Sequence, residues 1–199
     1  MHELKDWHIQ LMNEGFLDSD DSLSCKTAEG IFCIDNTSGA VVSLELAGRP
    51  YLAHWSIYRN RPEIRAIIHS SAPATQTFSH LGRNLKPLLD DFAQIVGPSA
   101  RCAIRPKQIC GKLKSRNAVL LIGDGALCAA PSLDDAYATA LVLEKNARAQ
   151  IEGSFLGGAK RISSLEALFM RRTYLTKYSK ADAQNILSQD DEPEIDDRD

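Results

Sequence analysis

The clearest pattern in the sequence is a short apolar run, Ile64 to Ile68, which ends in His69-Ser70-Ser71. The run is rich in β-branched residues and too short for a helix, so it predicts a buried strand. Side chains two apart on a strand point to the same face, so we expect His69 and Ser71 to reach into one cleft. Pro73 then ends the strand, and a polar turn leads into a helix.

Hydrophobic spacing before this strand predicts a mixed set of elements. Helical spacing is found at 3–14 and 51–59, and strand-like runs at 30–34 and 41–46. Residues 16–24 are acidic and hydroxyl-rich, which is typical of a loop, and 35–39 is typical of a turn.

After the strand, helices are expected at 85–96, within 106–115, at 133–152 and from Ser164 to Tyr174. Ser132 is typical of an N-cap, with acidic residues in the first turn of the helix that follows. A second buried strand is expected at 119–122. Strands and helices alternate without a long linker, which predicts a single α/β domain over residues 1–189.

Composition places the chain among ordinary globular proteins, with 44% hydrophobic and 25% charged residues. There is no apolar run long enough to span a membrane and no secretory leader pattern, so a cytoplasmic location is the default expectation. The five cysteines lack metal-finger spacing, so we expect free thiols.

Charge is concentrated in two segments. Residues 190–199 contain seven acidic residues and one arginine, a net charge of −6, which predicts a disordered tail. Residues 101–116 carry six basic residues and no acidic one. This stretch has no aromatic residues to stack on bases, so we expect no nucleic-acid partner. A solvated helix face is the simple interpretation, and an acidic protein partner is the alternative.

Three segments together resemble one family. They are HWSIYRNRPEIRAIIH at 54–69, NAVLLIGDG at 117–125 and DDAYATALVLE at 134–144. In order and spacing they are similar to the class II, zinc-dependent aldolase and adducin-head family, which includes fuculose-phosphate and rhamnulose-phosphate aldolases. The resemblance implies a nine-stranded, mostly antiparallel central sheet flanked by helices, and a homo-oligomer, usually a tetramer.

The resemblance also implies a metal site, but the metal ligands differ. The family holds its ion with three histidines, whose positions here are His69, Ser71 and Asp124. Zinc needs three good protein ligands, and serine is a poor one. A harder ion such as manganese could accept Asp124 and hydroxyl oxygens. His69 and Asp124 could share an ion only if their ligand atoms lie within about 6 Å of each other.

The other family positions are also altered. The acid/base glutamate of the family aligns with Pro50, and Glu45 could replace it only if the loop is shifted. The phosphate loop aligns with Asp21 to Ser24, where carboxylates would repel a phosphate. Ser38-Gly39 is the remaining match to the phosphate site, and Arg49 could add one anion contact.

Two hypotheses follow from these substitutions. In the first, the chain is a non-catalytic or strongly diverged family member that acts as an assembly or interaction module, with no cofactor. In the alternative, it is a metal-dependent sugar-phosphate aldolase or epimerase that uses zinc or manganese held by His69, Asp124 and a third ligand. No catalytic residue is assigned under either hypothesis. The residues with a candidate role in substrate binding are Ser38, Gly39, Arg49 and Ser71.

Overall fold

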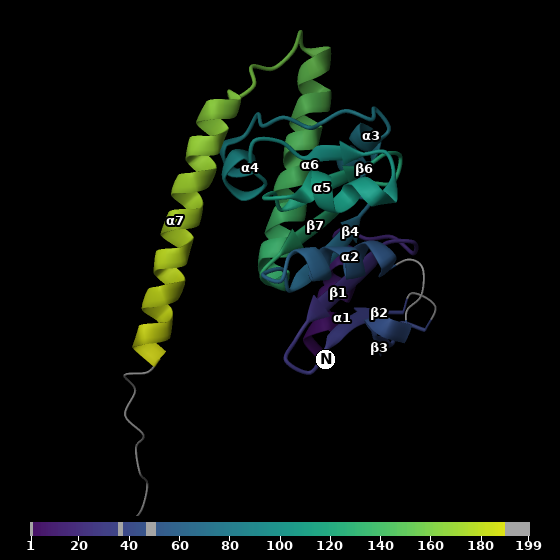
Figure 1. The fold of residues 1–199 in the computed structure, drawn as a ribbon. Coiled ribbons are helices and arrows are strands. Elements are labelled where there is room, and N and C mark those ends of the chain that lie inside the picture. The colour runs from purple at the N-terminus through teal and green to yellow at the C-terminus, as the bar shows by residue number, and fades with distance from the viewer. Residues whose placement is uncertain (1, 36–37, 47–50, 190–199) are drawn as a thin grey trace, which may run out of the picture.

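A computed structural model describes residues 2–35, 38–46 and 51–189, with side chains in the last helix described up to residue 177. In this part of the chain seven strands form one sheet in the order β3-β2-β1-β4-β7-β6-β5 (Figure 1). The strands are β1 Ser22–Lys26, β2 Ile31–Ile34, β3 Val41–Ser43, β4 Ala66–Ser70, β5 Arg101–Ala103, β6 Ala118–Leu121 and β7 Ala126–Ala130. The helices are α1 His2–Asn13, α2 Leu52–Asn60, α3 Pro73–Ser79, α4 Asp90–Ile95, α5 Ile109–Leu113, α6 Leu133–Phe155 and α7 Ser164–Gln189.

The sheet is mostly antiparallel, as expected, and its one parallel pair is β5 with β6. The predicted apolar strand is β4, which lies at the centre between β1 and β7. The seven strands are fewer than the nine that the family resemblance implied, a difference that concerns the described residues only. No helix among these residues is long and apolar enough to cross a membrane.

Helices cover both faces of the sheet. Alternate residues of β4 point to opposite faces, so Ile68 packs with one core cluster and Ile67 with the other. The first cluster includes residues of α1, α3, α4 and α6, and the second includes residues of α2 and α5. Helix α7 lies on the outside of the molecule against α4 (Figure 1).

Several expected elements differ in their bounds. Strand β1 begins inside the segment expected to be a loop, because the hydroxyls of Ser22 and Ser24 are buried and bonded to His54. Strand β7 was not expected, since its short Ala-rich sequence has little β-branching. The strand expected at 41–46 ends at Ser43 and continues as a 3-10 turn, Leu44–Leu46.

The helix expected at 85–96 is reduced to α4, Asp90–Ile95. The buried Asn146 explains this difference, because its side-chain oxygen accepts from the backbone N–H groups of Leu88 and Leu89. Its amide nitrogen also donates to the carbonyl of Lys86. These backbone groups therefore bond to a side chain instead of forming a helical turn.

Two further predictions concern helix ends. Ser132 caps α6 as predicted, and its Oγ accepts from the backbone N–H of Asp135 at 3.1 Å. Helix α3 begins directly at Pro73, so the expected polar turn is absent. Helix α7 begins at Ser164 as expected, but it continues well past Tyr174 to Gln189. The acidic segment 190–199 lies outside the described residues, and its predicted disorder stays a prediction.

Candidate functional site

The end of β4 meets the turn between β6 and β7. The Nε2 of His69 lies 2.8 Å from the backbone carbonyl of Asp124 and 3.6 Å from its carboxylate. Because a carbonyl can only accept, Nε2 carries the proton of this bond. The two residues that the sequence assigned to a vestigial metal site are therefore in contact.

Gly125 allows this close approach. Its φ is +61°, and a Cβ at this position would lie 2.1 Å from the carbonyl oxygen of Ser70. Any other residue would collide with the backbone of β4, and its backbone would also be strained. The glycine after Asp124 therefore leaves the space that the turn needs to lie against the strand end.

Ser71 bonds to the acidic loop that precedes β1. Its Oγ donates to Asp21 at 2.5 Å and its backbone N–H donates to the same carboxylate at 2.9 Å. Asp18 lies 3.0 Å from the Ser71 hydroxyl. The Nδ1 of His69 lies 3.9 Å from the other oxygen of Asp21. His69 and Ser71 thus both approach Asp21 of their own chain, but Ser71 is not among the residues that line the cavity beside His69, where both side chains were expected.

Two of the three acidic residues of this loop, Asp18 and Asp21, have pKa shifts of opposite sign. Burial raises the pKa of the Asp21 carboxyl, although hydrogen bonds from Ser71 and Asp18 oppose the shift. The pKa of Asp18 is lowered, chiefly by the hydrogen bond from the backbone N–H of Asp20. Asp21 is almost fully buried, so its ionised form is stabilised by the hydrogen-bond donors around it and not by water.

His54 is a core residue that bonds to strand β1 behind the site. It is 0% exposed, and its ring nitrogens lie 2.6 Å from the Ser24 hydroxyl and 3.0 Å from that of Ser22. Burial lowers its pKa to about 3, so the ring is neutral at ordinary pH. Tyr58 bonds to the Ser24 hydroxyl at 2.9 Å. This first motif of the family resemblance therefore has a structural role here.

A cavity of about 330 Å³ opens beside the His69–Asp124 contact. Much of its lining is apolar, including Leu52, Ile104 and Leu127. Its polar groups come from Ser22, His69, Arg105 and Asp124. The cleft therefore offers few hydrogen-bonding groups for a polyhydroxylated substrate.

The residues present do not match the zinc site of the family. In the described part of the chain, no group of three or more His, Cys, Asp or Glu side chains is arranged to hold a metal ion. Nε2 of His69 is occupied by a carbonyl, and Ser71 is a neutral hydroxyl bonded to carboxylates. A catalytic zinc needs three good ligands and one open position, which this donor set does not supply.

The other predicted binding residues lie elsewhere or outside the described part. Ser38 and Gly39 form the turn between β2 and β3, where the Ser38 hydroxyl donates to Asp35 and the Gly39 N–H donates to the Asp35 carbonyl. Neither is among the residues that line the cleft. Arg49 and Pro50 lie outside the described residues. The assignments of Ser38, Gly39 and Arg49 to substrate binding stay predictions.

Sequence reasoning missed two parts of the site. It read the loop acids as a source of repulsion and did not foresee that Asp18 and Asp21 would bond to Ser71. The available signal was the spacing Asp-x-x-Asp, in which backbone N–H groups of the loop bond to nearby carboxylates. It also missed Glu144, whose carboxylate accepts from the N–H groups of Ala74 and Thr75 at the start of α3.

Comparison with known proteins defines the class. The chain belongs to the class II aldolase and adducin N-terminal domain family, whose sequence model matches residues 19–151. The curated 5-deoxy-D-ribulose 1-phosphate aldolase of Bacillus thuringiensis serovar kurstaki is 29% identical over 115 residues, which are 54% of this chain and 54% of that protein. The chain thus spans about half the length of this relative.

Two solved structures have the same fold. An L-fuculose 1-phosphate aldolase gives a TM-score of 0.75 at 19% identity, covering 87% of this chain and 94% of that chain. The L-fuculose 1-phosphate aldolase of Glaciozyma antarctica PI12 gives 0.70 at 21% identity, covering 86% and 79%. At these identities the likeness concerns the fold and leaves the chemistry to be argued from the site.

Proposed function

We propose that this chain is a strongly diverged, non-catalytic member of the family that acts as an assembly or interaction module. The carrying observation is the bonding of Ser71 to Asp21 and Asp18. The resemblance places the second metal-binding histidine at this position. Here the position carries a hydroxyl whose donor is already used within the chain, beside a nearly buried carboxylate.

Charge supports the same proposal. A sugar phosphate carries about two negative charges near neutral pH, and anions are repelled by nearby carboxylates. The loop that aligns with the phosphate loop carries Asp18, Asp20 and Asp21, and Asp21 is nearly buried. A phosphate at this place would meet acidic side chains, so the mode of binding that the resemblance implies is disfavoured.

Exposed apolar residues support an assembly role. Leu52, Ile104 and Ile122 line the cleft and are 62%, 61% and 43% exposed. Large exposed apolar side chains that gather at one place are typical of surfaces that bind other proteins. We propose that the chain forms a homo-oligomer, with a tetramer as the form that the family resemblance suggests.

Metal content of the purified protein tests this proposal. The tag-free chain is incubated with zinc or manganese, dialysed and measured by mass spectrometry, beside His69→Ala and the control His2→Ala. We expect every sample to retain far less than one ion per chain. Near-stoichiometric metal that is lost in His69→Ala but kept in His2→Ala would contradict the proposal.

An activity assay and a mass measurement complete the test. We expect no aldol cleavage of L-fuculose 1-phosphate or 5-deoxy-D-ribulose 1-phosphate with either metal. Light scattering during gel filtration would give the mass, which for a monomer is 21.9 kDa. A monomer at micromolar concentration would contradict the assembly role.

One observation favours a second candidate, a metal-dependent sugar-phosphate aldolase or epimerase with an altered site. The His69 Nε2 and the Asp124 carboxylate are 3.6 Å apart, well within the limit for two ligands of one ion. An oxygen-preferring ion such as manganese would suit this pair better than zinc. Cleavage of either sugar phosphate in the presence of manganese, lost in His69→Ala, would establish this candidate.

A further inference from the structure

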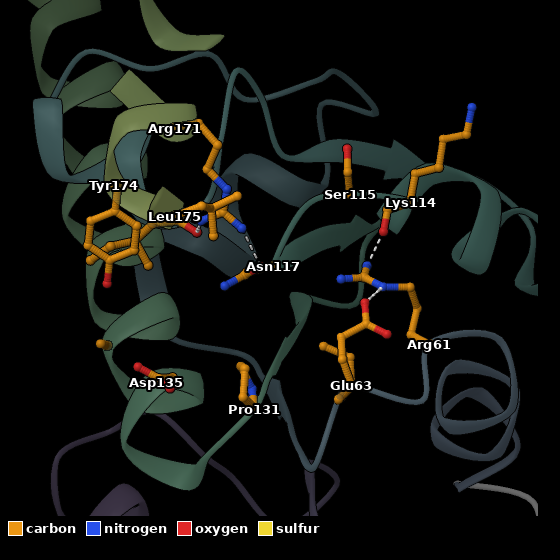
Figure 2. Close-up of a pocket in the computed structure, with 13 residues that line it drawn as sticks. Arg61, Glu63, Lys114, Ser115, Asn117, Pro131, Asp135, Arg171, Tyr174 and Leu175 are labelled. Atoms are coloured by element: carbon orange, nitrogen blue, oxygen red, sulfur yellow. Dashed lines mark hydrogen bonds and ion pairs between the residues drawn. The ribbon is translucent and has the colours of Figure 1, made fainter. Parts of the chain in front are cut away.

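A second and larger cavity lies at the opposite end of the central strands. The cleft adjoins His69 near the end of β4, where Ser70 pairs with Ala126. The second cavity has a volume of about 470 Å³ and adjoins Ile64, which precedes β4, and Pro131, which follows β7. Helix α7 closes it through Arg171 and Tyr174 (Figure 2). The two cavities are therefore separate sites.

Arg171 is the most unusual residue of this second cavity. Its side chain comes from α7 and is only 8% exposed. Nη1 donates to the carbonyls of Gln94 and Ile95. Nη2 donates to the Asn117 side-chain oxygen at 2.7 Å (Figure 2). All three acceptors are uncharged, so the positive charge is solvated without being neutralised.

Part of this arrangement has a structural explanation. The carbonyls of Gln94 and Ile95 belong to the last turn of α4, so Arg171 ties α7 to the C-terminal end of that helix. This role does not use Nε, which is buried and has no hydrogen-bond partner among the described residues. A buried donor without an acceptor is unfavourable, so the structural role of Arg171 does not explain the position of Nε.

The charge of Arg171 is also unpaired. No carboxylate in the described part of the chain lies within ion-pair distance of it. The two acids that line the cavity have other contacts: Glu63 pairs with Arg61, and Asp135 accepts from the Ser132 hydroxyl at 2.8 Å. Burial lowers the pKa of Arg171 to about 10, a value that still leaves the guanidinium charged at neutral pH.

A second buried arginine extends the positive region. Arg116 is 9% exposed, and its Nε likewise lacks a partner among the residues that the structure describes. It lines an adjoining recess of about 380 Å³ together with Arg171 and the exposed Arg172. Two buried arginines whose Nε atoms lack a partner in the described part of the chain thus line one recess, with no carboxylate among the residues of the recess.

Apolar groups form another part of the cavity wall, beside the polar side chains of Arg61, Glu63, Lys114, Ser115 and Asp135. Ile64, Ile95 and Ala138 line it, together with the ring of Tyr174. A cavity with apolar walls and a few polar groups is typical of small-molecule sites, and about 300–1,000 Å³ is their usual volume. The walls suit a compact hydrophobic or aromatic body, and the guanidinium suits an oxyanion at one end of it.

We propose that this cavity binds a small organic oxyanion, a carboxylate or phosphate joined to a compact apolar body, with Arg171 as the group that recognises the anion. The site lies away from the aldolase cleft and does not depend on the function proposed for that cleft. It would make the chain a ligand-binding protein whether or not the cleft has any activity.

Calorimetric titration of the full chain with defined probes tests this site. Phenyl phosphate and phenylacetate carry one anion and one ring, and they separate phosphate from carboxylate recognition. Benzyl alcohol has the ring without the anion, and inorganic phosphate has the anion without the ring. We expect saturable one-site binding of at least one ring-bearing anion, no binding of benzyl alcohol, and weaker binding of inorganic phosphate.

Matched variants locate the binding. Arg171→Gln should weaken it by about 10-fold or more, because hydrogen bonds to a charged group contribute about 1.5–3 kcal/mol. The control Arg161→Gln changes an exposed arginine outside the cavity and should bind like the wild type. Ala138→Phe fills the cavity without touching the bonds of Arg171 and should abolish binding.

Either of two results would overturn the proposal. One is the absence of saturable heat with both ring-bearing anions at millimolar concentration. The other is unchanged affinity in Ala138→Phe, which would place the binding elsewhere. If circular dichroism shows that Arg171→Gln does not fold, because the tie between α4 and α7 is lost, Ala138→Phe decides the question alone.

Discussion

The two ends of the central strands satisfy their buried polar groups differently. At the cleft end the charged and polar side chains bond to groups of their own chain. The Asp21 carboxylate accepts from the hydroxyl and backbone N–H of Ser71 and from the backbone N–H of Asp18. At the other end Arg171 has only neutral acceptors, and its Nε has no partner among the described residues. At the end that resembles an active site, more of the buried polar groups are hydrogen-bonded within the chain than at the other end.

Under the proposal above, the cavity at Arg171, and not the inherited cleft, is where this chain binds a ligand. A side chain that is bonded within the chain must lose those bonds before it can bind anything else. A buried donor without a partner among the described residues, such as Nε of Arg171, has no such bond to lose. The predictions below test how tightly the cleft end is closed.

The largest effect is expected for Gly125→Ala at the turn between β6 and β7. The added Cβ would lie 2.1 Å from a backbone oxygen of β4, which no side-chain movement can relieve. We expect a loss of about 4 kcal/mol or more in the free energy of unfolding, measured by urea denaturation.

Gly123→Ala in the same turn is the matched control. Its φ is also positive, at +68°, but the new Cβ would meet only the His80 ring at an ordinary 3.8 Å. Only the backbone conformation is then strained, so we expect a loss of about 1–2 kcal/mol. Equal losses in the two variants would show that the turn is not held tightly against Ser70.

The next effect concerns Glu144, which supports the cleft end from α6. Its carboxylate accepts from the N–H groups of Ala74 and Thr75 and from the Thr75 hydroxyl, at 2.8–2.9 Å. Glu144→Ala leaves these buried donors without a partner, and we expect a loss of about 3 kcal/mol in the free energy of unfolding. The exposed Glu152→Ala on the same helix should change stability by less than about 0.5 kcal/mol. A similarly small loss at Glu144 would mean that water replaces it easily.

A pH-dependent effect is expected from His54. Its pKa is about 3 in the folded chain, against about 6.5 for an unperturbed imidazole, so acid protonates the unfolded state first. This contribution to stability is complete above pH 6.5 and is lost as the pH falls towards 3. Between pH 7 and pH 5 we expect wild type to lose about 2 kcal/mol more than His54→Gln, which cannot titrate. Parallel curves for the two proteins would show that the ring is accessible to protons.

Much of the fold could be predicted because hydrophobic spacing encodes it directly. The run before His69 has a strand pattern, and Ser132 has the pattern of a helix cap; both are confirmed. Strand β1 could not be predicted in the same way, because Ser22 and Ser24 look like loop residues until His54 is brought to them from α2. Tertiary hydrogen bonds determine the secondary structure of such segments, and the local spacing of hydrophobic residues carries no information about these bonds.

The candidate site was predictable in position but not in chemistry. The contact of His69 with Asp124 is present, and the family resemblance indicated it by placing both residues at the metal-ligand positions. The bond from Ser71 to Asp21 joins residues 50 positions apart and depends on the pairing of β1 with β4. The cavity around Arg171 gave no sequence signal, since a single arginine on a helix resembles any surface residue.

The smallest effect is expected from Asp21 and has the opposite sign to that of His54. Burial raises the pKa of Asp21 in the folded chain above the unfolded value, so the folded state takes up its proton first. This contribution to stability is present at low pH and is lost as the pH rises through the folded pKa. Asp21→Asn should therefore remove a gain in stability that wild type shows as the pH falls from 7 towards the unfolded pKa of an aspartate. The gain should be smaller than the loss due to His54, because the hydrogen bonds from Ser71 and from the backbone of Asp18 favour the ionised form of Asp21.

Asp18→Asn serves as the control. The pKa of Asp18 is lowered, so its contribution to stability is lost only in stronger acid, and the change in stability between pH 7 and pH 5 should be the same as in wild type. If Asp21→Asn keeps the wild-type pH dependence, the carboxylate is solvated, and the cleft end is more open to a ligand than its hydrogen bonds indicate.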